Sequence, residues 1–347
     1  MFREIEKKES VGYGLSERGF YNIRFLGEKA EIDFDSYQIT IDKKDFSNSF
    51  FWKEYFIISN SNSKNVSVFL GDSLIDNLSG FINSVNNEYL ILNKKVSSDR
   101  SLNILNKDFN IVVTFENSWA KWLINTDVFI FSEYRNLEIL KVYNFNTKSI
   151  IEISIPLDEW SGLDGEKNKN RIYQTIGQWK NELLVFIGRF RLISFDLETG
   201  KELWRIDDFI KEVSSNPIFD FTNGVSAYVK WHLSGSEDEA YLLVRNCLFK
   251  LDLNNKKSQL IKDYNESTEQ EWYFKHSRLY DDYITFSGAN VLGKFPMVAG
   301  VIDRNTKEIL WTTKCEPGVY FEEAPQIKED KLYILDSSKT LRIFEEI

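Results

Sequence analysis

Short apolar runs separated by tight polar turns recur along this chain of 347 residues. The clearest copy is ISFDLETGKELWRI (193–206), in which two apolar runs flank a polar turn and a Trp lies just inside the second run. Similar hairpins occupy 142–153, 248–261 and 301–313. Their aligned polar residues are Asn144, Asp196, Asp252 and Asp303, at intervals of 52, 56 and 51 residues. Such a period predicts a repeated structural unit.

Each clear hairpin follows further strand-like segments. A preceding apolar strand is predicted at DVFIFSE (127–133), ELLVFIGR (182–189), AYVKWHLS (227–234) and DDYITFSG (281–288). A shorter segment comes before some of these, as in RIYQTIG and QEWYFKH. Side chains alternate within RLISFDL, as expected for a strand. Four strands in a unit of 35 to 55 residues are typical of a propeller blade.

The predicted fold is therefore all-β, a single β-propeller of four-stranded blades over residues 1–347. Hairpins centred near residues 70, 106, 144, 196, 252, 303 and 343 predict seven blades. Six or eight blades, or two smaller β domains, are alternatives, because the first third of the chain is poorly periodic. The last predicted blade lacks an outer strand, so an N-terminal strand should join it and close the ring. We predict an N-terminal tail (1–18), closing strands (19–45) and blades (46–347).

Two turns carry a family resemblance. FDLETGKELW and IDRNTKEILW resemble the repeat of the quinoprotein-like (PQQ-like) propellers, with Gly200 supplying a positive φ and Trp204 and Trp311 wedged between blades. The other copies are degenerate. The resemblance implies a protein scaffold, because the adjacent cysteines and export signal of a PQQ enzyme are missing. WD40 repeats are the alternative, but their Gly-His and Trp-Asp landmarks are absent.

Composition narrows the possible partners. The formal net charge is −10, which disfavours nucleic acid as a partner and favours a basic protein. Cys247 and Cys315 lie in different repeats, so no disulfide framework is implied. The start MFREIEKKES has no apolar core of signal-peptide length, and the apolar runs are too short for a membrane span. We expect a cytoplasmic, bacterial protein that is a monomer or part of a hetero-complex, with no membrane association.

Catalytic chemistry finds little support in the sequence. His232 and His276 are the only histidines, and each is expected to be structural. The acidic loop 158–168 departs from EF-hand spacing, so calcium binding is not expected there. Paired carboxylates such as Asp281 and Asp282 are expected to be surface charge. We therefore expect no catalytic residues, no cofactor and no metal, and a protein that is not an enzyme.

Loop length indicates which side of the propeller is used. With strands a to d in each blade, the d–a and b–c connections open on one face and the a–b and c–d connections on the other. Long d–a loops are predicted at 157–170, 207–217, 262–270 and 314–325, and long b–c loops at 233–240 and 288–297. Binding residues are concentrated on the long loops of rigid scaffolds, so we expect the face with the d–a and b–c loops to be the functional one.

That face is predicted to bind a protein through carboxylates that surround aromatic anchors. The candidate residues are Asp158, Trp160, Asp164, Glu166, Glu237, Asp238, Glu239, Phe295, Tyr320, Phe321, Glu322 and Glu323. The leading hypothesis is a non-enzymatic protein-binding propeller, in its sharper form an immunity or antitoxin protein that neutralises a basic effector such as a toxin. The alternatives are a carbohydrate-active lyase or hydrolase and a glycan binder that stacks sugars on Trp160 and Phe321.

Overall fold

The structure of this chain is a computed structural model. It describes residues 2–8, 21–34, 36–60, 64–85, 88–96, 99–123, 128–133, 138–156, 159–161, 167–169, 172–187, 191–207, 231–233, 238–244, 246–264, 272–290 and 295–346. These residues form β-strands and one short 3₁₀ helix. They divide into two compact units, each described by itself: unit 1 holds Met1–Glu9, Leu157–Asp196 and Lys201–Ile347, and unit 2 holds Ser10–Pro156 and Leu197–Gly200.

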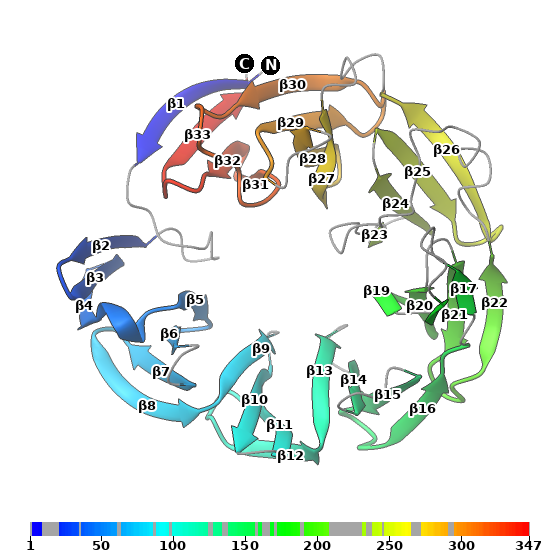
Figure 1. The fold of residues 1–347 in the computed structure, drawn as a ribbon, viewed down its shortest axis with the longest axis horizontal. Coiled ribbons are helices and arrows are strands. Elements are labelled where there is room, and N and C mark those ends of the chain that lie inside the picture. Colours follow the sequence, from blue (N-terminus) through cyan, green and yellow to red (C-terminus); the bar gives the residue numbers. More distant parts are fainter. Residues whose placement is uncertain are drawn as a thin grey trace. The chain divides into compact units, whose positions relative to one another are not determined.

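Unit 2 contains blades 1 to 4, numbered in chain order, and consecutive strands of each blade pair antiparallel (Figure 1). Blade 1 has three described strands: β2 (Asn22–Leu26), β3 (Lys29–Phe34) and β4 (Tyr37–Asp42), followed by helix η1 (Lys43–Asp45). Blade 2 has β5 (Asn48–Trp52), β6 (Tyr55–Asn60), β7 (Asn65–Leu70) and β8 (Ser73–Ser79). Blade 3 has β9 (Phe81–Val85), β10 (Leu90–Val96), β11 (Asp99–Leu105) and β12 (Ile111–Glu116). Blade 4 has β13 (Ser118–Leu123), β14 (Val128–Glu133), β15 (Ile139–Asn144) and β16 (Ile150–Ser154).

Unit 1 contains blades 5 to 8 and a separate two-stranded hairpin, β17 (Glu159–Ser161) with β18 (Lys167–Lys169). Blade 5 has β19 (Ile172–Trp179), β20 (Glu182–Ile187), β21 (Arg191–Asp196) and β22 (Glu202–Ile206). Blade 6 has β23 (Trp231–Leu233), β24 (Glu239–Val244), β25 (Cys247–Asp252) and β26 (Lys257–Asp263). Blade 7 has β27 (Trp272–Leu279), β28 (Tyr283–Asn290), β29 (Val298–Asp303) and β30 (Ile309–Lys314). Blade 8 has β31 (Gln326–Lys328), β32 (Lys331–Leu335), β33 (Leu341–Glu346) and β1 (Phe2–Lys8).

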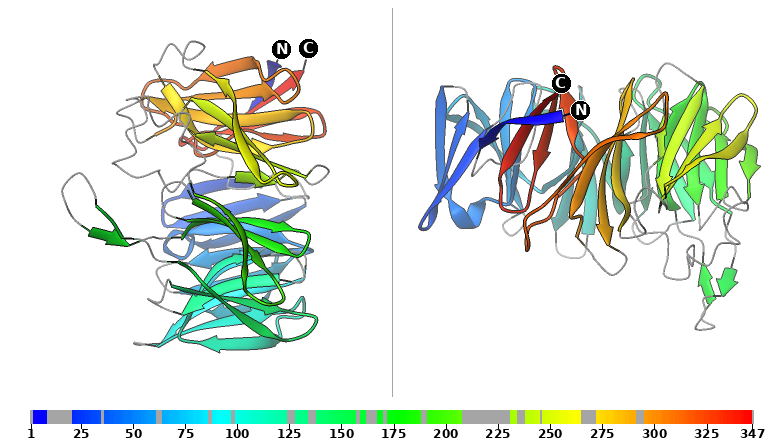
Figure 2. Two further views of the ribbon diagram at one scale, coloured as in Figure 1. Left: turned by 90° about the vertical axis from the view of Figure 1, so that its right-hand side faces the viewer. Right: turned by 90° about the horizontal axis from the view of Figure 1, so that it is seen from above.

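These sheets give an all-β, eight-bladed β-propeller, so the fold class is confirmed and the preferred count of seven blades was one too few. The missed blade is blade 1, whose strands were predicted to close the ring. The closing strand is β1, in the segment predicted to be a tail, and it pairs antiparallel with β33 (Figure 2). β1 was read as a tail because an outermost strand lies mostly in solvent and therefore carries charged residues, as in FREIEKK.

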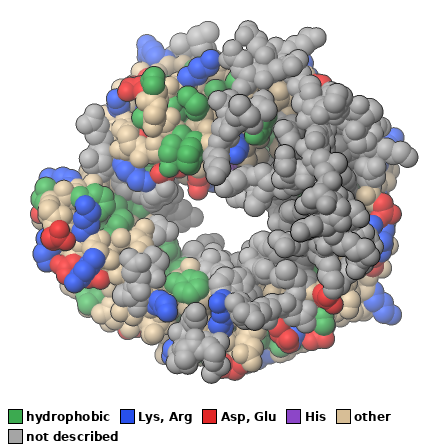
Figure 3. Space-filling model, viewed as in Figure 1, with side chains coloured by type: hydrophobic (Ala, Val, Ile, Leu, Met, Phe, Trp, Pro, Cys, Tyr) green, Lys and Arg blue, Asp and Glu red, His purple; other side chains and the backbone are tan. Residues whose placement is uncertain are grey.

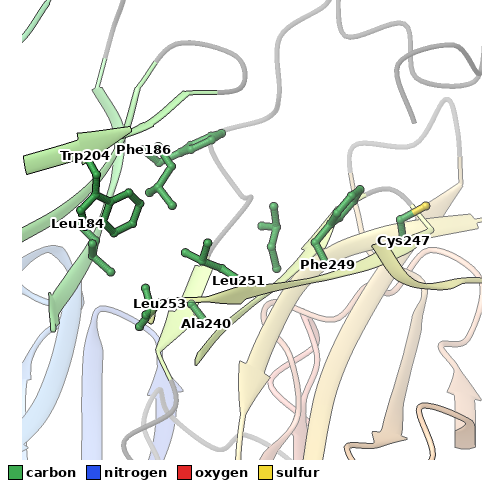
Figure 4. Close-up of a cluster of buried hydrophobic side chains, with 10 residues drawn as sticks. Leu184, Phe186, Trp204, Ala240, Cys247, Phe249, Leu251 and Leu253 are labelled. Atoms are coloured by element: carbon green, nitrogen blue, oxygen red, sulfur yellow. The ribbon is translucent and has the colours of Figure 1, made fainter. Parts of the chain in front are cut away.

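The core of each unit lies between neighbouring blades. Between blades 5 and 6, Phe186 and Trp204 pack with Phe249 and Leu251 (Figure 4). In unit 2, Phe115 of blade 3 stacks on Phe131 of blade 4 with ring centroids 4.3 Å apart. Inner strands that are covered on both faces are almost continuously apolar, whereas outer strands alternate.

The recurrent Asp or Asn of the repeat shapes the turn between the third and fourth strands. Asn144 Oδ1 accepts hydrogen bonds from the backbone N–H of Asn146 (2.9 Å) and Thr147 (3.0 Å). Asp303 Oδ1 accepts the equivalent bonds from Asn305 and Thr306, both at 2.7 Å. A short side chain that bonds to the backbone two or three residues later is a local turn-former. Turn formation thus explains why Asp or Asn recurs at this position of the repeat.

The fourth residue after this Asp or Asn takes a left-handed conformation. Gly200 has φ +70°, as predicted, while Lys148, Lys256 and Lys307 occupy the equivalent position at φ 54–64°. Two of these lysines extend across the boundary to the preceding blade. The Lys256 ammonium lies 5.8 Å from the centre of the Trp204 ring, and the Lys307 ammonium lies 5.4 Å from the centre of the Tyr241 ring. Cation–π contacts of this kind offset part of the backbone cost of a left-handed lysine.

Candidate functional site

The structure describes the side chains of seven of the twelve predicted binding residues. Asp158, Asp164, Glu166 and Glu237 lie outside the described residues, and of Trp160 only the backbone, in β17, is described. The described residues fall into two separate groups: Asp238 and Glu239 at blade 6, and Phe295, Tyr320, Phe321, Glu322 and Glu323 where blades 7 and 8 meet.

The second group is built from two connections that hold each other by backbone hydrogen bonds. The b–c loop of blade 7 (291–297) accepts bonds at Pro296 O from Phe321 N (2.8 Å) and at Met297 O from Cys315 N (2.9 Å). On the other side, Ser337 N donates to Tyr320 O at 2.8 Å, and Tyr320 N donates to Ser337 Oγ at 3.1 Å. The connection between blades 7 and 8 is therefore fastened to both blades.

Aromatic and thioether side chains project from this frame into solvent. Phe295 stacks on Tyr320 with ring centroids 4.4 Å apart and an interplanar angle of 25°. The Phe295 residue is 55% exposed and Met297 is 41% exposed. Phe295, Met297, Tyr320, Glu322 and Glu323 together are called the Phe295 surface below. It matches the prediction that long loops present apolar groups on the d–a and b–c side, and it adds Met297, which the prediction missed.

Phe321, by contrast, is a core residue. It is fully buried and packs with Phe2, Val301, Ile334 and Phe344 from blades 7 and 8. The expectation that Phe321 is an exposed anchor or a stacking platform for sugars is therefore wrong. The physical reason is that this large apolar ring contributes more stability by packing between blades 7 and 8 than by remaining in solvent.

The carboxylates of the Phe295 surface are held in ion pairs. Glu322 Oε1 lies 2.7 Å from Lys339 Nζ, and the Glu322 side chain is only 12% exposed. Glu323 pairs with Arg278, whose Nε also donates to the carbonyl of Ala324 at 3.3 Å. These pairs reduce the negative potential expected from sequence alone, since the basic partners come from distant positions in the chain.

Asp238 and Glu239 lie at the other end of their blade. The second strand of blade 6 is β24, which begins at Glu239, and not 227–234 as predicted; its innermost strand is β23. The loop 233–240 is thus an a–b connection, which contradicts its assignment as a b–c loop. The sequence misled because the apolar segment AYVKWHLS was read as the second strand, so the acidic stretch after it was taken as the next connection. Asp238 and Glu239 are removed from the predicted binding face.

The surroundings of Asp238 confirm its place among the a–b and c–d turns. Its carboxylate accepts hydrogen bonds from Trp179 Nε1 (2.7 Å) and Asn254 Nδ2 (2.8 Å). These bonds, the indole first, lower the pKa of the Asp238 carboxyl group. Glu239 accepts a bond from the Tyr241 hydroxyl at 2.7 Å and pairs with Lys250. Both carboxylates therefore connect elements of unit 1.

Among the described residues on the face shown in Figure 3, charges of both signs are mixed, for example around blade 1. Within the described ranges, no group of three or more His, Cys, Asp or Glu side chains is arranged to hold a metal ion. The loop 158–168, considered for calcium, is mostly outside those ranges. The same part of the chain has no helix that is long and apolar enough to cross a membrane. His276 is half-buried in β27.

The two thiols are poor nucleophiles. Cys247 is buried between blades, and burial raises the pKa of its thiol to about 12. Cys315 is half-buried beneath the Phe295 surface, and burial together with the nearby Asp336 carboxylate raises its pKa to about 12 as well. A thiol with such a pKa holds almost no thiolate at neutral pH, and the thiolate is the reactive form.

Comparison with known proteins supports the fold. No family model matches the chain, and no curated protein matches it. BamB from Moraxella catarrhalis, a PQQ-like repeat propeller, is similar over 100% of both chains with 9% identity and a TM-score of 0.50. The designed Ika8 protein matches over 99% of this chain and 98% of its own, at 8% identity and a TM-score of 0.58. The Cps50 (Swd1) β-propeller domain from Myceliophteria thermophila covers 88% of this chain and 99% of its own, with 11% identity and a TM-score of 0.50. These likenesses show the β-propeller fold, which is commonly a protein-binding scaffold.

Proposed function

We propose that this protein is a non-enzymatic β-propeller that binds a protein partner through the Phe295 surface. One observation carries the proposal: Phe295 is exposed and stacks on the half-buried Tyr320, and backbone hydrogen bonds fasten the loops that carry both rings to two blades. Rigid, exposed aromatic groups lose little conformational entropy on binding and are typical hot-spot residues. Met297 beside them adds a flexible, polarizable contact that suits a protein surface.

The finer proposal is that the partner is a basic effector, such as a toxin, and that this chain is an immunity or antitoxin protein. Its support is the net charge of −10, which would steer a basic protein toward the propeller. Both described carboxylates of the Phe295 surface are paired, and Glu316, whose side chain is 70% exposed, lies 3.7 Å from Arg342 Nη2. The attraction would therefore come from the net charge of the whole chain.

Site-specific photo-crosslinking tests the docking surface. A photoreactive phenylalanine analogue replaces Phe295 in one variant and Phe25 in the control, because Phe25 of β2 is 49% exposed and also contacts another aromatic ring. The native host expresses each variant. We expect one discrete crosslinked protein at position 295 and none at position 25. Identical products from both positions would contradict the proposal.

Once the partner is purified, its affinity for each variant can be measured. Phe295→Ala should weaken binding at least tenfold, since hot-spot truncations exceed about 2 kcal/mol and about 1.4 kcal/mol is tenfold in affinity. Phe25→Ala should leave the affinity unchanged. A basic partner predicts that the affinity falls as salt rises and that Glu316→Lys weakens it. If the affinity for the partner does not change with salt concentration, the proposal of a basic effector is overturned. The proposal that the Phe295 surface is the docking site would still stand.

A further inference from the structure

The outer strands of the blades differ in regularity. Among the described residues, six of the eight outer strands contain a β-bulge, in which one extra residue stands opposite the neighbouring strand, and this residue is aliphatic in all six. Bulges twist an edge away from straight pairing and so protect it from added strands. The six bulge residues are Ile5, Ile75, Val112, Leu203, Ile261 and Leu310.

Two outer strands, β4 and β16, pair with their neighbours in unbroken register. The edge of β16 is covered within unit 2. Gly200 stands so close to it that a Cβ there would lie 2.4 Å from the Glu152 carbonyl oxygen. Ile155 N donates to Glu138 O at 2.7 Å, so Ile155 bonds to the β15 side. Backbone groups alternate in direction along an antiparallel strand, so the Glu152 carbonyl points away from β15, toward the open edge. β4 is thus the straight edge that the described residues leave open.

The open edge of β4 is formed by the backbone groups of Gln38 and Thr40. Lys43 N donates to Glu28 O at 2.8 Å, so by alternation Ile41 and Ile39 bond to β3, while Gln38 and Thr40 point outward. Both residues are exposed, and no described residue bonds to their outward N–H and C=O groups. A row of free donors and acceptors at strand spacing is a template for another strand.

The two faces beside this edge differ. Ile39 and Ile41 face blade 2, where Tyr37 lies against the turn at Gly71 and is itself 44% exposed. Leu70, which precedes that turn, is 49% exposed. The opposite face carries Gln38 and Thr40. An added strand would therefore place apolar side chains on the blade 2 face and polar side chains on the other.

Charges at the edge are already matched. Lys29 Nζ lies 2.7 Å from Asp42 Oδ1, and Lys44 Nζ lies 3.7 Å from the other oxygen of that carboxylate. Arg24 Nη2 lies 2.7 Å from Asp33 and 3.5 Å from Glu31, so three cations face three carboxylates. Lysines commonly guard exposed edges, but Lys29 is directed to its own cross-strand partner. The local charge complement is neutral, so it selects an uncharged strand over a strongly acidic or basic one.

We propose that the β4 edge of blade 1 binds an extended, uncharged segment of a partner protein, with alternating apolar and polar residues, as an added β-strand. Main-chain hydrogen bonds to Gln38 and Thr40 would supply affinity, and Tyr37 with Leu70 would select the apolar residues. This site is on unit 2 and does not depend on the Phe295 surface of unit 1.

Random decapeptides displayed on phage and panned against the whole protein test the proposal. Enriched clones should show apolar and polar residues in alternation. In the Thr40→Pro variant the outward N–H is lost, while the ladder to β3 is kept. The control is Thr312→Pro in the bulged strand β30. Thr312 is also exposed, and alternation from the Cys315 N to Met297 O bond directs its backbone groups outward. A synthetic enriched peptide should bind Thr40→Pro at least tenfold more weakly and Thr312→Pro as it binds the wild type.

A second variant tests the same edge in case the proline variant does not fold. Gln38→Lys with Thr40→Lys keeps every backbone donor and blocks the edge with charge, and it should also weaken the peptide at least tenfold. Hydrogen exchange should slow at 38–42 when the peptide binds, and Phe295→Ala should leave the affinity unchanged. Equal binding to the lysine variant and the wild type, enrichment of peptides without alternation, or no enrichment would each overturn the proposal.

Discussion

Replacing Gly200 by Ala probes how the turn of the repeat is tied to the neighbouring strand. Gly200 has φ +70°, and an added Cβ would stand 2.4 Å from Glu152 O and 3.1 Å from Ile151 Cγ2. Two costs follow. The left-handed backbone costs an alanine about 1–2 kcal/mol, and crowding against an immovable backbone oxygen costs about 1–3 kcal/mol more. We expect Gly200→Ala to lower the free energy of unfolding by about 2–5 kcal/mol.

Gly27 provides a matched control. It has φ +59° in the turn between β2 and β3, and an added Cβ would meet no atom within 4 Å. Gly27→Ala therefore carries the backbone cost alone, about 1–2 kcal/mol. The difference between the two variants isolates the contact between the turn and β16.

Urea unfolding followed by tryptophan fluorescence measures both variants against the wild type. The slope of the free energy against urea must stay the same for the comparison to hold. Gly200→Ala should reach its midpoint at clearly lower urea than Gly27→Ala. Equal losses for the two variants would refute the reasoning, because they would mean that the turn has room to move away from β16.

Three further expectations concern turns, thiols and the core. Backbone hydrogen bonds hold the pKa of Asp252 and Asp303 below the usual value. The two ionised carboxylates therefore stabilise the fold above about pH 4, the pKa of an unfolded Asp. This stabilisation is lost as the pH falls through the lower pKa of the folded protein. Replacing both by Asn, which keeps the acceptor oxygen, should flatten the acid loss of stability in urea unfolding at pH 2–5; an unchanged pH profile would count against this. Cys247 and Cys315 should react with a thiol reagent at pH 8 far more slowly in the native protein than in urea, and fast native labelling would contradict their burial. Trp204→Ala, which empties the core between blades 5 and 6, should cost about 3–5 kcal/mol by the same urea assay, and a loss below about 1 kcal/mol would show that the site collapses.

The sequence alone predicted the features that depend on interactions between residues close together in the chain. The Asp or Asn at the start of each turn and the glycine at position 200 act within a few residues, so their pattern predicted the hairpins and the fold class. The wedge position of Trp204 and Trp311 was also predicted, and both pack against the next blade. These features depend on short-range hydrogen bonds and on hydrophobic periodicity, which leave a mark in any single strand.

Long-range pairing was decided only by the tertiary structure. Phe321 was read as exposed and is buried, and Glu322 was read as a free charge and pairs with Lys339. β1 was read as a tail and forms an outer strand, while the loop before Glu239 was placed at the wrong end of blade 6. Phe321, Glu322 and β1 find their partners in other strands or at the far end of the chain, and the order of strands in the sheet decided where the loop before Glu239 lies. A residue's own neighbours in sequence carry no record of such pairing.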